Sequence, residues 1–353
     1  MAQLDKIFRT AVQYKASDIY ITTGSKPILR INGDLVAIEE HAILSKKMAE
    51  DYILEILTDK QREEFARNLD LDFSLEVPGI SRFRVNLFVQ RKGIGADFRV
   101  IPENVHTIDE LGLPDQLRRI CQSDGGLVLV TGSTGSGKST TLSAMIHEIN
   151  NGAVAKHIIT IEDPIEYVHE NIKAIIDQRE VGTHTLSFQH ALRAALREDP
   201  DVVLVGEMRD LETISLALTA AETGHLVFAT LHTNGAATSV DRIIDAFPTN
   251  QQNQIRQQLA GSLRAIVWQS LMKTREGHGR VAGLEIMINN NAVANMIRKN
   301  KTHQLNSAIE TGSKEGMQTM KKSVTDLLEA GIIDEETALD NIPEEIDTGT
   351  QVT

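Results

Sequence analysis

The chain has 353 residues, long enough for two domains, and its hydrophobic content of 41% is sufficient for a sizeable core. A net charge of −13 disfavours general binding to nucleic acid, so we expect no nucleic-acid partner. The single cysteine, Cys121, excludes an internal disulfide and a zinc site made of several thiolates, and it is typical of a reducing cytoplasm.

The sequence shows neither a membrane span nor a signal peptide. No apolar run approaches the roughly 18 residues that cross a bilayer, and the first ten residues lack the basic, apolar and small-residue pattern of a signal peptide. We therefore expect a cytoplasmic protein whose association with a membrane comes through a partner.

Residues 1–100 are predicted to form a small α+β domain with a largely antiparallel sheet. Helical spacing of apolar residues is found at 4–12, and residues 45–68 are also predicted to be helical. The tripeptide Asn32-Gly33-Asp34 predicts a hairpin turn between two strands. The expected strands are 19–21, 28–31, 35–38, 71–75, 82–89 and 95–100.

Residues 101–115 are predicted to be a linker, because they include two prolines and few large apolar residues. From 116 to 340 apolar strands alternate with helices, which predicts an α/β domain whose parallel sheet is covered on both faces. Beyond 236 we expect mostly helix with one strand at 281–288, and then a disordered tail at 341–353. The earlier strands are expected at 127–131, 158–161, 202–205 and 226–230, and the helices at 139–150, 188–197 and 211–223.

The segment 132–140, GSTGSGKST, fits the phosphate-binding pattern G-x-x-x-x-G-K-[ST] without a mismatch and lies between a predicted strand and a predicted helix. Glycines let backbone N–H groups point at phosphate oxygens, and the helix adds the positive end of its dipole. We expect Lys138 to reach the β- and γ-phosphates of ATP and the Ser139 hydroxyl to bind Mg²⁺. The predicted nucleotide-binding residues are Gly132, Ser133, Thr134, Gly135, Ser136, Gly137, Lys138, Ser139 and Thr140.

Two carboxylates follow the next predicted strand. Glu162 and Asp163 come directly after strand 158–161, at the carboxyl edge where open parallel sheets bind ligands. By itself, this pattern would fit an acidic surface turn equally well. Beside a P-loop, however, it favours a ligand-binding site. We expect both residues to assist Mg²⁺, partly through water, and Glu162 is also a catalytic candidate.

The short apolar strand 202–205 is followed by one glycine and then by Glu207. An apolar strand that leads into an acidic residue is typical of a Walker B segment. We expect the Glu207 carboxylate to orient and deprotonate the attacking water. Gly206 stands where many ATPases have an aspartate, so Mg²⁺ would depend more on Ser139 and on Glu162 and Asp163.

Two histidines flank the strand 226–230. His232 is expected at the ligand edge, where a neutral imidazole is able to hydrogen-bond a phosphate, and His225 at the far edge. The alternative for each is a structural histidine with satisfied hydrogen bonds.

Four arginines, Arg82, Arg84, Arg91 and Arg99, lie in or beside the predicted strands 82–89 and 95–100. Arg82 and Arg84 share the face opposite apolar neighbours, so they form a basic surface in an acidic protein. One interpretation is a set of arginine fingers for nucleotide in a neighbouring subunit. The other is ion pairing with acids of the same sheet, namely Asp72, Glu76 or Asp97.

The order of the motifs in this chain resembles that of the secretion ATPase superfamily, which drives type II secretion, type IV secretion and type IV pili. These motifs are the P-loop, the acids at 162–163, the Walker B glutamate and the histidine segment 224–232. Longer strings resemble the retraction ATPases of type IV pili, which power twitching motility. These are ASD at 16–18, RFRVN at 82–86, ALREDPD at 195–201, GEMRDLET at 206–213 and DRIIDAFP at 241–248.

This resemblance extends from about residue 3 to about residue 335 and implies a PAS-like N-terminal domain followed by a RecA-like ATPase domain. It also implies a ring of six identical subunits that bind ATP and Mg²⁺ between the two domains, with the trans-acting arginines on Arg84 and Arg99. The implied partners are the platform protein at the inner-membrane base of the pilus and, in addition, a second retraction ATPase.

Two details bear on the direction of such a motor. Extension ATPases usually carry a four-cysteine zinc motif, which a chain with one cysteine does not have. The retraction family carries a C-terminal AIRNLIRE signature, and here the matching stretch 292–299 reads AVANMIRK, with Ala294 for the first arginine and Lys299 for the glutamate. A secretion or extension ATPase of the same superfamily, or a non-hydrolysing accessory ring subunit, therefore remains an alternative.

Overall fold

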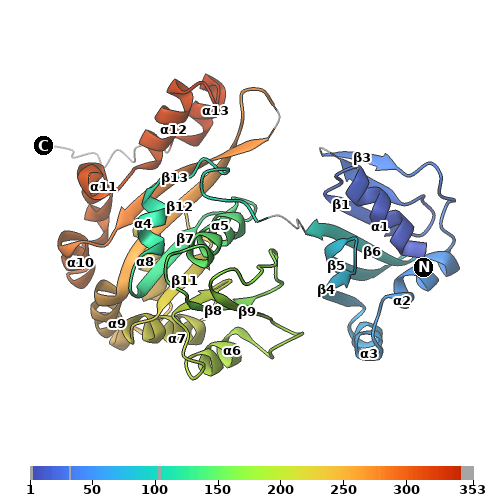
Figure 1. Ribbon diagram of the computed structural model, residues 1–353, viewed down its shortest axis with the longest axis horizontal. Coiled ribbons are helices and arrows are strands. Elements are labelled where there is room, and N and C mark those ends of the chain that lie inside the picture. Colours follow the sequence, from blue (N-terminus) through green and yellow to red (C-terminus); the bar gives the residue numbers. More distant parts are fainter. Residues whose placement is uncertain (1–2, 32, 102–104, 278, 343–353) are drawn as a thin grey trace, which may run out of the picture. The chain divides into compact units, whose positions relative to one another are not determined.

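The computed structural model describes residues 3–31, 33–101, 105–277 and 279–342 (Figure 1). The chain divides into two compact units. The first contains the N-terminal residues up to Asn104 together with Pro164–Val168, and the second contains the remainder. Each unit has its own sheet and its own core.

The first unit is a six-stranded, fully antiparallel sheet, and the predicted α+β domain with a largely antiparallel sheet is confirmed. Its strand order, which the sequence did not predict, is β3-β2-β1-β6-β5-β4. Its core includes Phe8 from α1, whose ring stacks on Phe83 at 4.4 Å and meets Phe98 at 5.1 Å. The strands are β1 Asp18–Thr22, β2 Ile28–Ile31, β3 Asp34–Ala37, β4 Asp70–Val77, β5 Ser81–Gln90 and β6 Gly93–Ile101.

The helices of this unit are α1 Gln3–Gln13, α2 Lys46–Glu55 and α3 Asp59–Asn68. The predicted helical stretch 45–68 is therefore two helices. Thr58 begins the second one with a capping box, in which its side chain accepts from the N–H of Gln61 and the Gln61 side chain accepts from the Thr58 N–H. The predicted turn between β2 and β3 includes Asn32, which lies outside the described residues.

The described part of the predicted linker, residues 105–115, packs on the second unit, because Ile108 and Leu113 are buried in one of its cores. The helix α4 Gln116–Cys121 follows, and Cys121 is buried at its end. Burial raises the pKa of the Cys121 thiol far above its ordinary value, so it is an inert core residue.

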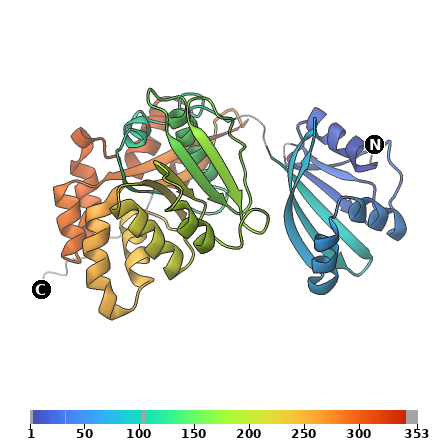
Figure 2. The same cartoon turned by 60° about the horizontal axis from the view of Figure 1, so that its bottom comes forward.

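The second unit has a seven-stranded sheet in the order β13-β12-β7-β11-β10-β8-β9, parallel except for the edge strand β13. Figure 2 shows helices on both sides of this sheet. The α/β prediction is confirmed. The strands are β7 Gly126–Thr131, β8 His157–Glu162, β9 Ile175–Glu180, β10 Val202–Val205, β11 Leu226–Leu231, β12 Leu263–Lys273 and β13 Arg280–Ile288.

One expectation for this sheet is wrong. Beyond residue 236 the sequence predicts a single strand, yet β12 is a second one, and it lies between β7 and β13. Its leucine, methionine, glutamine and lysine residues favour helix, but pairing on both sides overrides that local preference. The edge strand β9 was also not predicted.

Helices cover both faces of this sheet, and alternate residues of β7 face the two layers. Leu127 and Leu129 belong to the core that includes α6 to α11, whereas Val128 and Val130 belong to the core with α4 and α5. The helices are α5 Lys138–Asn150, α6 Phe188–Ala195, α7 Leu211–Glu222, α8 Ala236–Asp245, α9 Thr249–Ser262, α10 Asn291–Arg298, α11 Leu305–Thr311, α12 Met320–Glu329 and α13 Glu335–Asn341.

Among the helices in the described part of the chain, none has the length and apolar character needed to cross a membrane. The predicted tail begins within α13, which ends at Asn341, and residues 343–353 lie outside the described residues.

Candidate active site

The loop 132–137 leaves the buried strand β7 and leads directly into α5. Its three glycines all have left-handed backbone angles, with φ of 141° at Gly132, 78° at Gly135 and 87° at Gly137. Side chains with a Cβ rarely adopt such angles, so the tight wrap depends on glycine. Two buried hydroxyls, on Thr131 just before the loop and on Ser136 within it, have no hydrogen-bond partner among the described residues, and this is consistent with a place that receives an anion.

Lys138 is the first residue of α5, and its side chain is buried although it carries a charge. Its Nζ donates to the carbonyl oxygens of Gly132 at 2.8 Å and Ser133 at 2.9 Å. The ammonium group is thus held over the loop at the positive end of the helix, where a phosphate would bind.

Ser139 and Thr140 occupy the next two positions of α5, and Ser139 is exposed. An exposed hydroxyl directly after the P-loop lysine is the kind of oxygen donor that Mg²⁺ prefers. In the described residues no group of three histidine, cysteine or acidic side chains is arranged to hold a metal by itself. A Mg²⁺ ion here would depend on nucleotide phosphates and water for most of its ligands, as is usual for this ion.

The carboxyl ends of β8, β10 and β11 meet at one edge of the sheet, since Val205 is aligned with Ile161 on one side and with Ala229 on the other. Glu162 therefore lies beside the segment that carries Glu207. One carboxylate oxygen of Glu162 accepts from Thr160 at 2.6 Å and from Gln178 at 3.2 Å.

Glu207 lies between a histidine and an arginine at this edge. Its Oε1 is 3.2 Å from Nε2 of His232 and its Oε2 is 2.8 Å from a guanidinium nitrogen of Arg209. Burial alone would raise the pKa of Glu207, but the hydrogen bond from Arg209 and the charges of Arg209 and His232 outweigh it, so the pKa falls below its ordinary value. The carboxylate is therefore ionised at neutral pH and its orientation is fixed.

The glycine before this carboxylate has a packing role. A Cβ on Gly206 would lie 3.2 Å from the Ile161 carbonyl and 3.3 Å from Cα of Glu162. The Gly206 carbonyl also accepts a hydrogen bond from the Thr230 hydroxyl at 2.5 Å. The absence of an aspartate at this position thus permits close contact between β10 and β8.

Of the two histidines beside β11, only His232 is at the ligand edge. His225 precedes the strand at the opposite end, where its Nδ1 lies 3.0 Å from the carbonyl oxygen of Ala220. This contact favours the alternative interpretation of His225, a structural histidine with satisfied hydrogen bonds.

The first unit presents charged residues in one row across the open face of its sheet. The register pairs Arg30 of β2 with Asp18 of β1, Asp18 with Arg99 of β6, and Arg99 with Arg84 of β5. Asp18 accepts from Nε of Arg99 at 3.0 Å, and Nε of Arg30 lies 3.7 Å from it. We call Arg30, Asp18, Arg99 and Arg84 the arginine row.

For Arg99, the ion pair that the sequence suggested is not the one found. Arg99 pairs with Asp18 rather than with Asp72, Glu76 or Asp97. Arg84 is exposed, and its side chain has no hydrogen bond or ion pair within the described residues. Because like charges directly opposite each other on paired strands are destabilising, the neighbours Arg84 and Arg99 favour an anion from outside the sheet.

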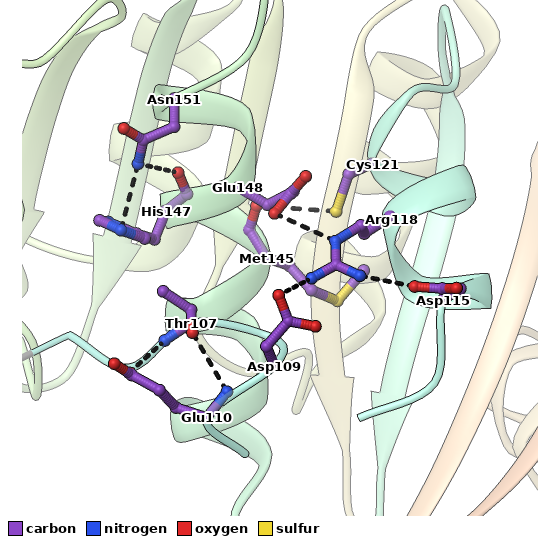
Figure 3. Close-up of polar contacts among 10 residues, drawn as sticks. All are labelled: Thr107, Asp109, Glu110, Asp115, Arg118, Cys121, Met145, His147, Glu148 and Asn151. Carbon is purple, nitrogen blue, oxygen red and sulfur yellow. Dashed lines mark hydrogen bonds and ion pairs between the residues drawn. The ribbon is translucent and has the colours of Figure 1, made fainter. Parts of the chain in front are cut away.

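The α5 helix is anchored three turns beyond Lys138 by ion pairs around Arg118 of α4 (Figure 3). The Arg118 guanidinium is 2.5 Å from Asp109, 2.5 Å from Asp115 and 3.6 Å from Glu148 on α5. The hydrogen bond from Arg118 lowers the pKa of Asp109. These contacts hold α5 against the segment that precedes α4 and touch no residue of the P-loop.

Three residues that contact candidate functional residues, each within its own unit, were not singled out in the sequence. Arg209 lies in the quoted string GEMRDLET and contacts Glu207. Asp18 lies in the quoted string ASD and contacts Arg99. Gln269, on the strand that was expected to be helical, contacts the P-loop itself.

The fold and this site together define a P-loop ATPase. Residues 1–341 match the family of type II/IV secretion system proteins, and the chain belongs to this family.

Three relatives are similar over nearly the whole chain. The type IV pilus retraction ATPase PilT of Pseudomonas aeruginosa is 51% identical over 331 residues, which are 93% of this chain and 95% of that protein. A twitching motility protein of Neisseria gonorrhoeae is 51% identical over 92% of this chain and 88% of its own length. The crystal structure of the pilus retraction motor PilT with bound ADP superposes with a TM-score of 0.90 at 45% identity and covers 98% of both chains.

Proposed function

We propose that this chain is an ATP-hydrolysing motor that drives retraction of type IV pili. The observation that carries the proposal is the Glu207 carboxylate, held ionised by Arg209 and His232 on the sheet edge that also carries the P-loop strand. Near full-length likeness to pilus retraction ATPases supports the assignment of this chemistry to retraction.

In the proposed reaction the loop amides and Lys138 bind the phosphates of ATP, and Glu207 orients the attacking water. A carboxylate with a lowered pKa is a weak base, so its main contribution is to position the water and to stabilise charge rather than to remove a proton early. His232 fixes the second carboxylate oxygen and would respond when the γ-phosphate leaves.

Magnesium is part of this proposal. Ser139 would bind the ion directly, and Glu162 and Asp163 would bind it partly through water. Bound there, Mg²⁺ would neutralise charge on the β- and γ-phosphates.

The proposed assembly is a homohexameric ring, in which Arg84 and Arg99 act on ATP bound to the neighbouring subunit. Their exposed, adjacent charges support this role. We further propose a cytoplasmic ring at the inner-membrane base of the pilus, with the platform protein and a second retraction ATPase as partners.

The helix α10 is the part of the chain that bears on direction. Ala294 is buried together with Val293 and Ile297, whereas Arg298 is exposed. A buried alanine has replaced the first arginine of the retraction signature, which favours a second candidate function, that of an extension or secretion ATPase.

Two measurements test these proposals. Phosphate release by the purified chain with Mg²⁺ and ATP is expected to be lost in Glu207→Gln and kept in Glu212→Gln, a nearby glutamate that pairs with Arg193. Equal rates would remove Glu207 from the reaction. The mass of the chain in solution with ATP tests the ring.

The direction of the motor, retraction or extension, is tested in a bacterium that lacks this chain. Loss of twitching with pili retained on the surface supports retraction. Loss of the pili themselves would assign the chain to extension, and defective protein export with normal pili would assign it to secretion.

A further inference from the structure

The strand β12 packs along β7 and brings one amide side chain against the P-loop. Trp268 is aligned with Thr131, the last residue of β7, so Gln269 follows at the point where the loop begins. The Gln269 side chain is buried, at 2% exposure, in the same unit as the loop.

The Gln269 carboxamide makes two short hydrogen bonds. Its Nε2 donates to the carbonyl oxygen of Ser136 at 2.7 Å, within the loop. Its Oε1 accepts from the hydroxyl of Thr141 at 2.7 Å, on the first turn of α5. Thr141 is also buried, so both bonds are shielded from water.

Gln269 also occupies the space that two loop glycines leave open. A Cβ on Gly132 would lie 2.4 Å from the backbone oxygen of Gln269, and a Cβ on Gly137 would lie 2.7 Å from its Nε2. A Cβ on Gly135 would meet nothing within 4 Å. The first and third glycines are therefore needed for contact with β12 as well as for their backbone angles.

A loop that turns its N–H groups toward a phosphate must satisfy its carbonyl groups elsewhere. Here the carbonyls of Gly132 and Ser133 are held by Lys138, which would give up contacts of this kind on reaching a phosphate. The Ser136 carbonyl is held by Gln269, whose amide is already engaged by Ser136 and Thr141. Its bond is therefore able to persist in the nucleotide-bound loop.

We propose that Gln269 is a positioning residue for nucleotide binding, which keeps the P-loop in its phosphate-binding conformation and ties it to α5. Gln269 touches no reacting atom. This inference rests on the nucleotide binding of the proposed function and adds a residue from the strand β12. Because the loop encloses the phosphates that ADP and ATP share, loss of Gln269 weakens the binding of both nucleotides alike.

The test compares Gln269→Met, which keeps the size of the side chain and removes both hydrogen bonds, with the wild-type chain. The dissociation constant for ADP is measured by calorimetry, and phosphate release is measured over a range of ATP concentrations. We expect Gln269→Met to raise Kd for ADP and KM for ATP by roughly tenfold, with kcat within about twofold of wild type.

The matched control is Asn289→Leu, which removes a half-buried amide that donates to the carbonyls of Ala260 and Leu263 and touches neither the loop nor α5. Both variants lose two amide hydrogen bonds, and thermal unfolding reports the resulting loss of stability. A positioning role requires that only Gln269→Met loses nucleotide affinity. Equal changes in both variants would reduce Gln269 to a structural residue and overturn the inference.

Two further variants separate the two bonds. Gln269→Glu is still able to accept from Thr141 but has no donor for the Ser136 carbonyl, so it is expected to bind ADP no better than Gln269→Met. Thr141→Val is expected to raise Kd for ADP by about threefold, whereas Thr141→Ser, which keeps the hydroxyl, is expected to bind ADP with wild-type affinity. Wild-type affinity in a folded Gln269→Met overturns the inference alone, whereas a wild-type chain that binds no nucleotide overturns the proposed function as well.

Discussion

The P-loop and the arginine row present positive charge to an anion in opposite ways. At the P-loop, Lys138 is buried and already held by two carbonyls, and a neighbouring strand fixes the loop. In the arginine row, Arg84 and Arg99 lie next to each other on an exposed sheet face, and Asp18 is the acid that pairs with Arg99. The first site is organised within one unit, whereas in the second the exposed Arg84 has no counter-charge among the described residues.

The contrast matches two different tasks. A loop whose backbone is already held in place binds phosphate with little change beyond the lysine side chain, which is useful for holding a nucleotide through a cycle. Exposed guanidinium groups are suited to a contact that forms and breaks as subunits move. The predictions below test this contrast.

The largest effect is expected from Lys138→Ala. The buried ammonium is the charge that would contact the β- and γ-phosphates, so we expect phosphate release to fall by roughly a thousandfold or more. Lys322→Ala is the control, because Lys322 is an exposed lysine that pairs with Asp326 on α12. Turnover within tenfold of wild type would show that the P-loop lysine does not bind phosphate here.

The next effect is expected from Arg84→Ala. This change should leave ADP affinity unchanged and slow ATP hydrolysis by roughly a hundred- to a thousandfold, as loss of an arginine finger does. Arg91→Ala, an exposed arginine just after β5, is the control. Unchanged hydrolysis would return Arg84 to a surface role without catalysis.

Mixing subunits distinguishes action within one chain from action on a neighbour. Arg84→Ala subunits keep an intact P-loop, and Lys138→Ala subunits keep an intact Arg84. If the arginine acts on the neighbour's nucleotide, a mixture of the two inactive variants regains part of the activity. No recovery in a mixture that forms mixed rings would contradict a trans role.

The third effect is on the pH dependence of stability, and it tests how much a buried, neutral histidine contributes to the second unit. His169 lies beside α5, with Nε2 3.5 Å from the Ser143 hydroxyl, and burial lowers its pKa from 6.5 to about 4. A histidine with a lowered folded-state pKa contributes stability above pH 6.5 that is lost as the pH falls toward 4. From the pKa values of 6.5 and about 4, the loss between pH 7 and pH 4.5 is about 2–3 kcal/mol.

His169→Phe should remove this part of the pH dependence. The free energy of unfolding in urea, followed by the fluorescence of the single tryptophan, Trp268, reports on the second unit. The exposed His190 supplies the control variant, His190→Gln. An unchanged difference between the two pH values in His169→Phe would show that acid destabilisation arises elsewhere.

Much of the P-loop region was predictable because its signals are local. An apolar strand, a glycine pattern and a helix follow one another within 25 residues, and the strand before Glu207 is a continuous apolar run. The contact between His232 and Glu207 also follows from adjacent parallel strands, since residues after such strands lie at the same edge.

The contacts that sequence reasoning missed depend on distant segments. Gln269 meets Thr141 across 128 positions, on a strand whose composition favours helix. Asp18 meets Arg99 across 81 positions, and the choice of Asp18 over nearer acids is set by the register of β1 on β6. No local pattern specifies such pairings, because they follow from how the sheet is assembled.

The smallest effect is expected from Asp18→Asn, which removes the acid that holds Arg99. Arg99 is 69% exposed but Asp18 only 13%, so the stability of the first unit should fall by about 1–2 kcal/mol. Hydrolysis should slow by roughly threefold to tenfold, less than in Arg84→Ala, because Arg99 keeps its charge and loses only its fixed orientation. ADP affinity should be unchanged.

Asp34→Asn removes an equal charge from the exposed strand β3 and serves as the control for net charge. Slower hydrolysis in Asp18→Asn alone would show that the arginine row, although exposed, is partly preorganised by its one acid. Equal rates in the two variants would show that the incoming phosphate orients Arg99 by itself. The P-loop would then be preorganised and the arginine row would not.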